Sequence, residues 1–318
     1  REEVRQRILR VIEETGYLPP RERKTRERAP GAPKRVAVLL PRLTNPYFVV
    51  LKRSMDDLCR AIPGLTLEYY PCDTTDIGGI LSVLDALAAR PVDAFLFRGV
   101  RSGRVRDRLN EMGRPVIFFD SDVPGAERLC LVGEDCVKSG RIAASLLAKS
   151  IGGAGQVAGI TGSADITSHR QRLTGFLEVM HTAYPDIEVV AQLYSQEQSV
   201  IAYEQTGKLL SEQPGLAGVC NLAGCSGEIG QAILEQRRNR AVRLVCYSTA
   251  SDVAALIRKG VVTFSISLRP REQGRILIET MNAYLTRGIR PASDFIKTPI
   301  SIALDENIDS LTMDFGDP

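Results

Sequence analysis

The amino-acid sequence predicts an α/β protein with two doubly wound parallel-sheet lobes, preceded by a short N-terminal helix and a linker. From Val36 onward, short apolar runs alternate with amphipathic stretches, which is typical of parallel strands connected by helices. About ten such strand–helix units follow one another, more than one open sheet holds comfortably. At 318 residues with 44% apolar side chains, the chain is long enough to bury two cores.

An amphipathic helix is predicted over residues 2–15, because apolar residues recur there at helical spacing and Gly16 provides a stop. Residues 21–35 follow as a linker, since they contain two prolines and no apolar side chain larger than Ala. Residues 1–35 hold eleven Lys/Arg and six Asp/Glu. This basic arm indicates contact with a polyanion, although a solvated tail has the same composition.

The rest of the chain predicts alternating strands and helices. The expected strands cover 36–40, 65–70, 93–97, 115–120, 130–133, 156–161, 187–194, 218–221, 243–247 and 262–267. The expected helices begin near 46 and then cover 76–89, 102–112, 136–150, 166–182, 199–212, 227–237, 252–258 and 271–286. A closed eight-stranded barrel would also alternate, but the irregular spacing and the extra units favour two open lobes.

Composition and missing motifs exclude several classes of protein. No apolar run approaches the ~20 residues of a membrane helix, and the charged N-terminus contains no intact secretory signal. The seven cysteines form no CxxC pair, which favours reduced thiols in a cytoplasmic protein over disulfides or metal. The glycines at 152–155 precede a strand, so they predict a turn rather than a nucleotide site. With no GxSxG motif either, we expect no enzyme, no metal and no cofactor.

Five segments carry a family resemblance in the expected order. They are TNPYF (44–48), VGEDCVKSGRIAA (132–144), GSADITSHRQRLTGF (162–176), VCNLAG (219–224) and RPREQG (269–274). Together they resemble the signature segments of sugar-binding proteins with the type I periplasmic-binding-protein fold. The resemblance implies a ligand site between two lobes, at the carboxyl ends of the strands.

The N-terminal segment resembles the last headpiece helix of LacI-type (lactose-repressor-like) transcription regulators. The matching positions are Arg5, Arg7, Ile12, Gly16, Tyr17 and Pro20. The resemblance implies a cytoplasmic, homodimeric repressor that binds operator DNA through a complete headpiece and responds to a small effector. The helix-turn-helix would lie upstream of the chain, and the linker lacks the family's A-R-x-L hinge motif. Hinge contacts to DNA would then come from basic residues alone: Arg21, Arg23, Lys24, Arg26 and Arg28.

The resemblance also implies domain boundaries. The headpiece remnant would span 1–20, the hinge linker 21–35, the N-terminal lobe 36–122 plus 268–300, and the C-terminal lobe 123–267 plus 301–318. One alternative function is the sugar-binding component of an ABC-type transporter, which predicts an export signal. Another is an enzyme of the same topology, which would need a convergent acid/base or metal cluster that the sequence does not reveal.

Ligand-binding residues follow from the same resemblance by position. They are Asn45, Tyr47, Phe48, Asp122, Arg170, Asn221 and Ser248. Aromatic rings would pack on the C–H faces of a sugar while polar groups bind its hydroxyls. The alternatives are core packing for the two aromatic residues and helix capping for Asn221.

Arginines near the expected cleft predict a charged effector. Arg98 and Arg101 follow the strand at 93–97, and Ser248 and Leu268 replace the Asp and Gln of the sugar-binding relatives. Several guanidiniums in one cavity would favour an anion, which Arg binds bidentately. The sequence therefore favours a sugar acid or a phosphorylated sugar, unless the two arginines begin a solvent-facing helix.

Overall fold

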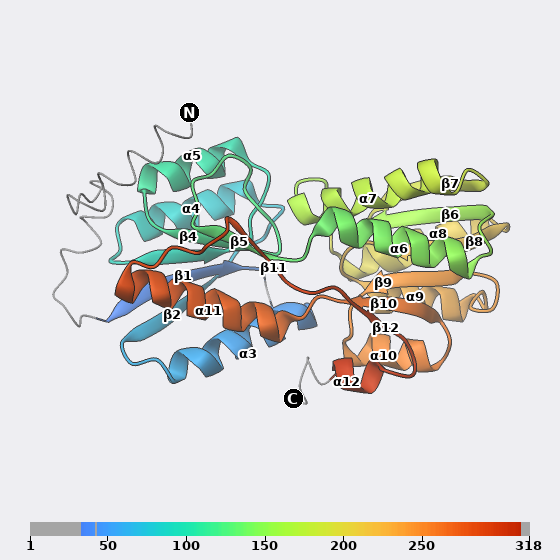
Figure 1. Cartoon of the computed structure of the whole chain (residues 1–318). Helices are drawn as coiled ribbons and strands as arrows, with labels where there is room; N and C mark the ends of the chain where they lie inside the picture. Colours follow the sequence, from blue (N-terminus) through green and yellow to red (C-terminus); the bar gives the residue numbers. More distant parts are fainter. Residues whose placement is uncertain (1–32, 42, 313–318) are drawn as a thin grey trace, which may run out of the picture.

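A computed structural model describes residues 33–41 and 43–312 of the chain. Two lobes lie side by side, and the chain crosses between them more than once (Figure 1). Each lobe contains a six-stranded sheet covered by helices on both faces, so the predicted architecture of two doubly wound lobes is confirmed. The predicted N-terminal helix and the basic linker residues 21–32 lie outside the described residues.

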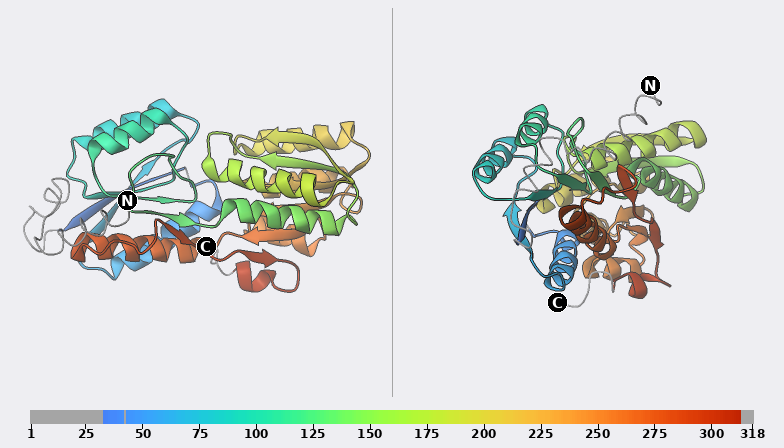
Figure 2. Two further views of the ribbon diagram at one scale, coloured as in Figure 1. Left: turned by 45° about the horizontal axis from the view of Figure 1, so that its top comes forward. Right: turned by 60° about the vertical axis from the view of Figure 1, so that its left-hand side comes forward.

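The first sheet has the strand order β11-β5-β4-β3-β1-β2, and all its neighbouring strands are parallel. Its strands are β1 (Lys34–Leu40), β2 (Leu65–Pro71), β3 (Ala94–Phe97), β4 (Val116–Phe119), β5 (Cys130–Gly133) and β11 (Phe295–Lys297). The helices of this lobe are α3 (Pro46–Arg60), α4 (Ile77–Ala88), α5 (Gly103–Met112) and α11 (Pro270–Arg287). Helices α3 and α11 cover one face of the sheet, and α4 and α5 cover the other (Figure 2).

The second sheet repeats this arrangement with the order β12-β10-β9-β8-β6-β7. Its strands are β6 (Gly155–Thr161), β7 (Ile187–Tyr194), β8 (Leu216–Asn221), β9 (Arg243–Tyr247), β10 (Val262–Ser267) and β12 (Ser301–Ala303), of which β12 is antiparallel to β10. The helices are α6 (Cys136–Ser150), α7 (Thr167–Ala183), α8 (Ser199–Glu212), α9 (Ser226–Glu235), α10 (Ser251–Arg258) and α12 (Ile308–Thr312).

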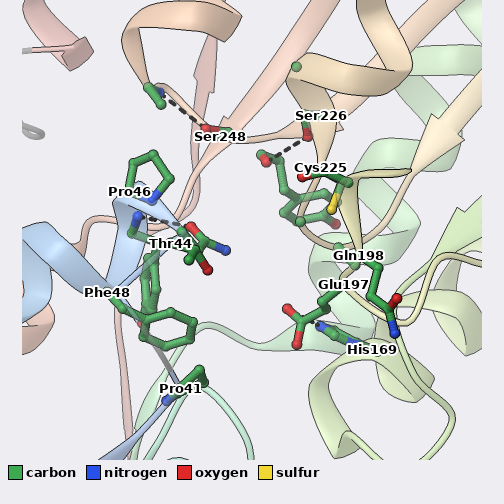
Figure 3. A pocket seen from close by; sticks show the side chains of 18 of the residues that line it. Pro41, Thr44, Pro46, Phe48, His169, Glu197, Gln198, Cys225, Ser226 and Ser248 are labelled. Atoms are coloured by element: carbon green, nitrogen blue, oxygen red, sulfur yellow. Dashed lines mark hydrogen bonds and ion pairs between the residues drawn. The ribbon is translucent and has the colours of Figure 1, made fainter. Parts of the chain in front are cut away.

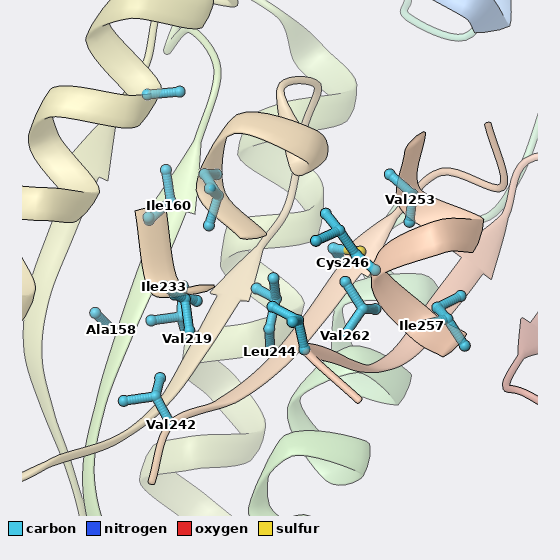
Figure 4. Close-up of a cluster of buried hydrophobic side chains, with 14 of the residues drawn as sticks. Ala158, Ile160, Val219, Ile233, Val242, Leu244, Cys246, Val253, Ile257 and Val262 are labelled. Atoms are coloured by element: carbon cyan, nitrogen blue, oxygen red, sulfur yellow. The ribbon is translucent and has the colours of Figure 1, made fainter. Parts of the chain in front are cut away.

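Burial on both faces explains why the strands read as continuous apolar runs. In β1, Val38 packs into the core beside α3 and α11, whereas Leu39 packs into the core beside α4 and α5. The second lobe behaves alike: in Figure 4, Val219 and Leu244 of the strands pack near Ile233 of α9. A further core lies beside α6 and α7, so each lobe is stabilised by apolar burial on both faces of its sheet.

Three segments connect the lobes. The chain leaves the first lobe at 134–135, returns at 268–269 and leaves again at 298–300. The first passage differs from the expected boundary between 122 and 123, because the apolar strand β5 pairs with β4 in the first sheet instead of joining the second lobe. The two lobes are therefore joined by three short segments.

A close contact between α6 and α7 fixes one wall of the cleft. A Cβ atom at Gly140 would lie 2.0 Å from the backbone oxygen of Arg172, and one at Gly175 would lie 2.1 Å from that of Val137. Only Gly permits this approach, so the two helices pack backbone to backbone. The contact holds α7 against α6 and so fixes the backbone from which the Arg172 side chain extends.

All seven cysteines lie in the described part of the chain and are free, and five of them are buried. Burial keeps those five thiols from oxidants, so their free state does not identify a compartment. Among the helices that the structure describes, none is long and apolar enough to cross a membrane.

Candidate functional site

A cavity of about 470 Å³ lies between the two lobes. The first lobe contributes the segment after β1, residues 73–75, Arg98 and Asp120, and the second lobe contributes loops that follow β6 to β9. In Figure 3, Pro46 and Phe48 lie on one side of this opening, opposite Glu197 and His169, and Ser248 is drawn above Pro46. Its position at the carboxyl ends of parallel strands is that of a ligand site in an α/β fold.

Aromatic rings form the first-lobe wall. Asn45 caps α3 by accepting a hydrogen bond from the Tyr47 N–H, which sets the direction in which the helix begins. The Tyr47 hydroxyl donates to Gln273 Oε1 at 2.7 Å, and its ring meets the Phe48 ring edge-to-face at 4.9 Å. Both rings are buried in the lobe and still border the cavity, so they combine core packing with a pocket wall.

Arg98 lies at the centre of an ion-pair network that spans the cleft. Its Nε donates to Asp120 Oδ2 at 2.7 Å, within the first lobe. Its Nη1 donates to Glu197 Oε2 of the second lobe at 2.9 Å, and its guanidinium lies 5.0 Å from the centre of the Phe48 ring. Burial opposes ionisation of Glu197, but its neighbours, Arg98 foremost among them, together outweigh burial and lower the pKa of the carboxyl to about 2.

Arg172 is the second buried guanidinium of the cleft. Its Nε donates to Glu134 Oε1 at 2.7 Å, its Nη1 donates to the Leu222 carbonyl at 3.2 Å, and it lies 4.5 Å from the Tyr247 ring centre. Within the described chain, Nη2 has no hydrogen-bond partner, although Asp120 Oδ1 is 3.7 Å away. A buried donor left in this state beside a cavity is suited to a ligand oxygen.

His169 borders the same network as a neutral ring. Its Nδ1 accepts a hydrogen bond from the Ser163 N–H at 3.0 Å, so its proton is on Nε2, which faces Glu197 Oε1 at 3.7 Å. Burial lowers the pKa of His169 to about 4, despite the attraction of the Glu197 carboxylate. The cleft therefore contains two guanidiniums but no imidazolium at neutral pH.

The low pKa of His169 predicts a pH-dependent stability. The unfolded chain protonates this side chain near pH 6.5, whereas the folded chain protonates it only near pH 4. Stability is therefore lost as the pH falls through this window, by about 2 kcal/mol between pH 8 and pH 5. We expect His169→Gln to remove that part of the pH dependence in chemical unfolding, while the exposed His181→Gln retains it. An equal loss in both variants would contradict the assignment.

The structure brings together five of the nine candidate binding residues, and their binding role remains a prediction. Those that line the cavity are Asn45, Tyr47, Phe48, Arg98 and Ser248. The other four lie elsewhere: Arg101, Asp122, Arg170 and Asn221. The basic candidates for DNA contact, Arg21, Arg23, Lys24, Arg26 and Arg28, lie outside the described residues.

Local contacts explain the four displaced residues. Arg101 and Arg170 are exposed, and Asp122 pairs with Arg128 at 3.2 Å. Asn221 is fully buried and donates to the Gly224 carbonyl and to Ser226 Oγ at the beginning of α9, so its amide is used in the turn, as in the capping alternative. Arg98 is itself paired with two carboxylates, so the expected array of uncompensated guanidiniums is absent from the described cleft.

Four charged or titratable residues of the cleft are absent from the predicted binding set: Asp120, His169, Arg172 and Glu197. A signal existed for two of them, because His169, Arg172 and Phe176 follow at helical spacing and are all buried on one face of α7. Glu197 lies in a loop without a recognisable pattern. No group of three or more His, Cys, Asp or Glu side chains in residues 33–41 and 43–312 is placed to hold a metal ion.

Comparison with known proteins gives the family. Residues 36–289 match the model of the periplasmic binding protein domain. The chain belongs to this family. The ribose import binding protein of Bacillus subtilis is 22% identical over 248 residues, which are 76% of this chain and 79% of that protein.

Solved structures of the periplasmic binding protein family share the fold. A solute-binding protein of an ABC transporter from Burkholderia graminis, in complex with D-arabinose, has a TM-score of 0.82 at 19% identity, covering 89% of this chain and 99% of its own. A glucose-galactose binding protein from Geobacillus stearothermophilus has a TM-score of 0.79 at 22% identity, covering 86% and 98%.

These comparisons correct the expectation of a LacI-type regulator. The matched family and the named relatives are import or solute-binding proteins, so the expected repressor function and cytoplasmic location are wrong. The comparisons support neither operator DNA nor a homodimer as a partner. The resemblance to sugar-binding proteins of the type I fold, which rested on the segments from 44 to 274, is confirmed.

Proposed function

We propose that this periplasmic binding protein is the sugar-binding component of an ABC-type importer, and that its cleft holds one neutral monosaccharide. The observation that carries the proposal is an aromatic wall opposite a wall of charged and polar groups. The Tyr47 and Phe48 rings border the cavity, where C–H groups can pack against them. Glu197 can accept hydrogen bonds from hydroxyls, and Arg172 Nη2, which has no hydrogen-bond partner in the described chain, can donate to them.

Charge favours a neutral ligand over an anion. Arg98 and Arg172 are the basic residues among the described lining residues, and each pairs with at least one carboxylate. The acidic lining residues are Asp73, Asp120, Glu197, Glu228 and Asp252. An anion entering this cleft would be repelled by carboxylates without gaining an unpaired guanidinium.

The relatives support the class of ligand and the location. The related import protein is named for ribose, and the Burkholderia graminis structure contains D-arabinose. We propose that the chain works outside the cytoplasm and binds its sugar without a catalytic step. Ser248 and Leu268 line the cleft where the resemblance implies Asp and Gln, so the preferred sugar differs from that of the relatives.

Thermal unfolding with a panel of neutral monosaccharides tests the proposal. The panel contains D-ribose, D-arabinose, D-glucose, D-galactose and D-allose, each at a large excess over the protein. A sugar at about 100 times its Kd stabilises the folded chain by about 2.7 kcal/mol, which raises Tm by several degrees. Stabilisation by no neutral sugar, in a chain that unfolds cooperatively, would contradict the proposal.

A further inference from the structure

The carboxylate of Glu197 occupies the side of Arg98 that faces the second lobe. Its two oxygens accept from Arg98 Nη1 at 2.9 Å and from Nη2 at 3.3 Å, while Arg98 Nε donates to Asp120. The Arg98 side chain is 2% exposed, and the central carbon of its guanidinium lies 5.0 Å from the centre of the Phe48 ring. Each edge of the planar fork that could grip an anion bidentately is therefore held by a carboxylate.

The backbone holds Glu197 in this position at a conformational cost. Gln196 and Glu197 both adopt left-handed conformations, with φ of 54° and 56°, which residues other than Gly seldom do. Hydrogen bonds from the Gln196 N–H to the Gly162 carbonyl and from the Gln198 N–H to the Ser195 carbonyl fix the turn. Strained conformations of this kind persist where the surrounding structure specifies them, and they gather at functional sites.

The same kind of strain recurs around the cleft. Residues other than Gly with positive φ that line the cavity in the described chain are Asp120, Gln196, Glu197 and Cys225. Two of these, Asp120 and Glu197, are the carboxylates that enclose Arg98. The arrangement of one guanidinium between two carboxylates is thus built into the backbone of both lobes, and it carries a net charge of −1 when both carboxylates are ionised.

We infer that Glu197 is a specificity-determining residue that excludes anionic sugars from the cleft by occupying the anion-binding edge of Arg98. The inference rests on the proposed function and adds the mechanism of selection. A sugar acid or sugar phosphate would have to displace Glu197 from Arg98 and leave its carboxylate unpaired. A neutral sugar can form hydrogen bonds with Arg98 and Glu197 while the ion pair between them stays intact.

The variant Glu197→Gln tests this inference, because it removes the charge and keeps the size of the side chain. Glu204→Gln is the matched control, since Glu204 is an exposed residue of α8 that does not line the cleft. Inorganic phosphate is the first probe, as it reports on Arg98 whichever sugar the protein prefers. D-Galactose with D-galacturonate, and D-ribose with D-ribose 5-phosphate, are the second probes. Affinities are measured by titration calorimetry at constant ionic strength.

We expect Glu197→Gln to bind phosphate at least tenfold more tightly than the wild type or Glu204→Gln, which corresponds to about 1.4 kcal/mol. The preference for a neutral sugar over its acid or phosphate should fall by the same factor. Equal phosphate affinity in the folded Glu197→Gln variant and the wild type would overturn the inference. If the variant does not fold, a wild type that binds galacturonate as tightly as galactose overturns it.

The two levels of the proposal fail in different ways. If a neutral sugar binds and phosphate affinity does not respond to Glu197→Gln, the role of Glu197 is wrong and the sugar-binding function stands. If phosphate responds and no neutral sugar binds the wild type, the proposed function is wrong although Glu197 still excludes anions from Arg98.

Discussion

Arg98→Met is expected to destabilise the protein by about 3–5 kcal/mol, because it removes the cation that pairs with Glu197 and leaves Asp120 only the 3.7 Å contact with Arg172. The side chains of Asp120 and Glu197 are only 8% and 22% exposed, so water cannot replace the lost guanidinium. Met retains most of the side-chain volume above the Phe48 ring, which separates the charge effect from a cavity effect. The free energy of unfolding in denaturant at neutral pH measures the change.

Arg101→Met is the matched control for this prediction. Arg101 lies three positions later in the same segment and is exposed, so its loss should change stability by no more than about 0.5 kcal/mol. Adding Glu197→Gln to Arg98→Met should restore part of the stability, since it removes one of the two opposed charges. A loss below about 1 kcal/mol in Arg98→Met would contradict the central role of the network.

Arg172→Met should have an effect of the same size on stability and a further effect on sugar affinity. The substitution leaves Glu134, whose side chain is 3% exposed, without its cation. It also removes Nη2, a donor without a hydrogen-bond partner in the described chain, from a side chain that lines the cleft. We expect a destabilisation of about 3–5 kcal/mol at neutral pH. Burial already raises the pKa of Glu134, so the destabilisation should shrink as the pH falls and this carboxyl becomes protonated.

A second substitution at the same position separates stability from binding. Arg172→Lys retains a cation for Glu134 and loses the planar fork, so it should unfold closer to the wild type while sugar affinity falls by more than tenfold. Arg170→Met is the control, because Arg170 is exposed on the same helix and does not line the cleft. Unchanged sugar affinity in a folded Arg172→Lys variant would contradict the binding role of Nη2.

The fold was predictable because its strands are buried on both faces. Short apolar runs such as residues 36–40 and 243–247 predict strands buried on both faces, and the structure places β1 and β9 there. The run at 130–133 was recognised as a strand, but its sheet was not. Nothing in four apolar residues specifies whether they pair with β4 or with a strand of the other lobe.

Site residues that directly follow a strand were predictable. Those whose position depends on the conformation of a loop were not. Arg98 directly follows β3, so its position at the carboxyl edge of the sheet followed from the alternation. Arg170 and Arg172 are two positions apart on α7 and therefore face opposite sides, and the buried face identifies Arg172. The position of the Glu197 side chain depends on left-handed backbone conformations at both Gln196 and Glu197. Gln and Glu do not predict such a conformation.

The expectation of an anionic ligand shows why the charge of a site cannot be inferred from its arginines alone. Arginines near a cleft favour an anion only when no carboxylate holds them. Glu197 is 99 residues away from Arg98 along the chain and belongs to the other lobe, so no local pattern reveals the pair. In the structure, Arg98 is thus paired with two carboxylates, which supports the proposal of a neutral ligand over the expected anion.

Titration calorimetry of the wild-type chain with the neutral monosaccharide that most raises its Tm is the most direct test of the sugar-binding cleft. The structure predicts saturable binding of one sugar per chain, lost by more than tenfold in Arg172→Lys and retained in Arg170→Met. Binding that is equally strong in both variants would place the sugar elsewhere, and the absence of any saturable binding would contradict the proposed function.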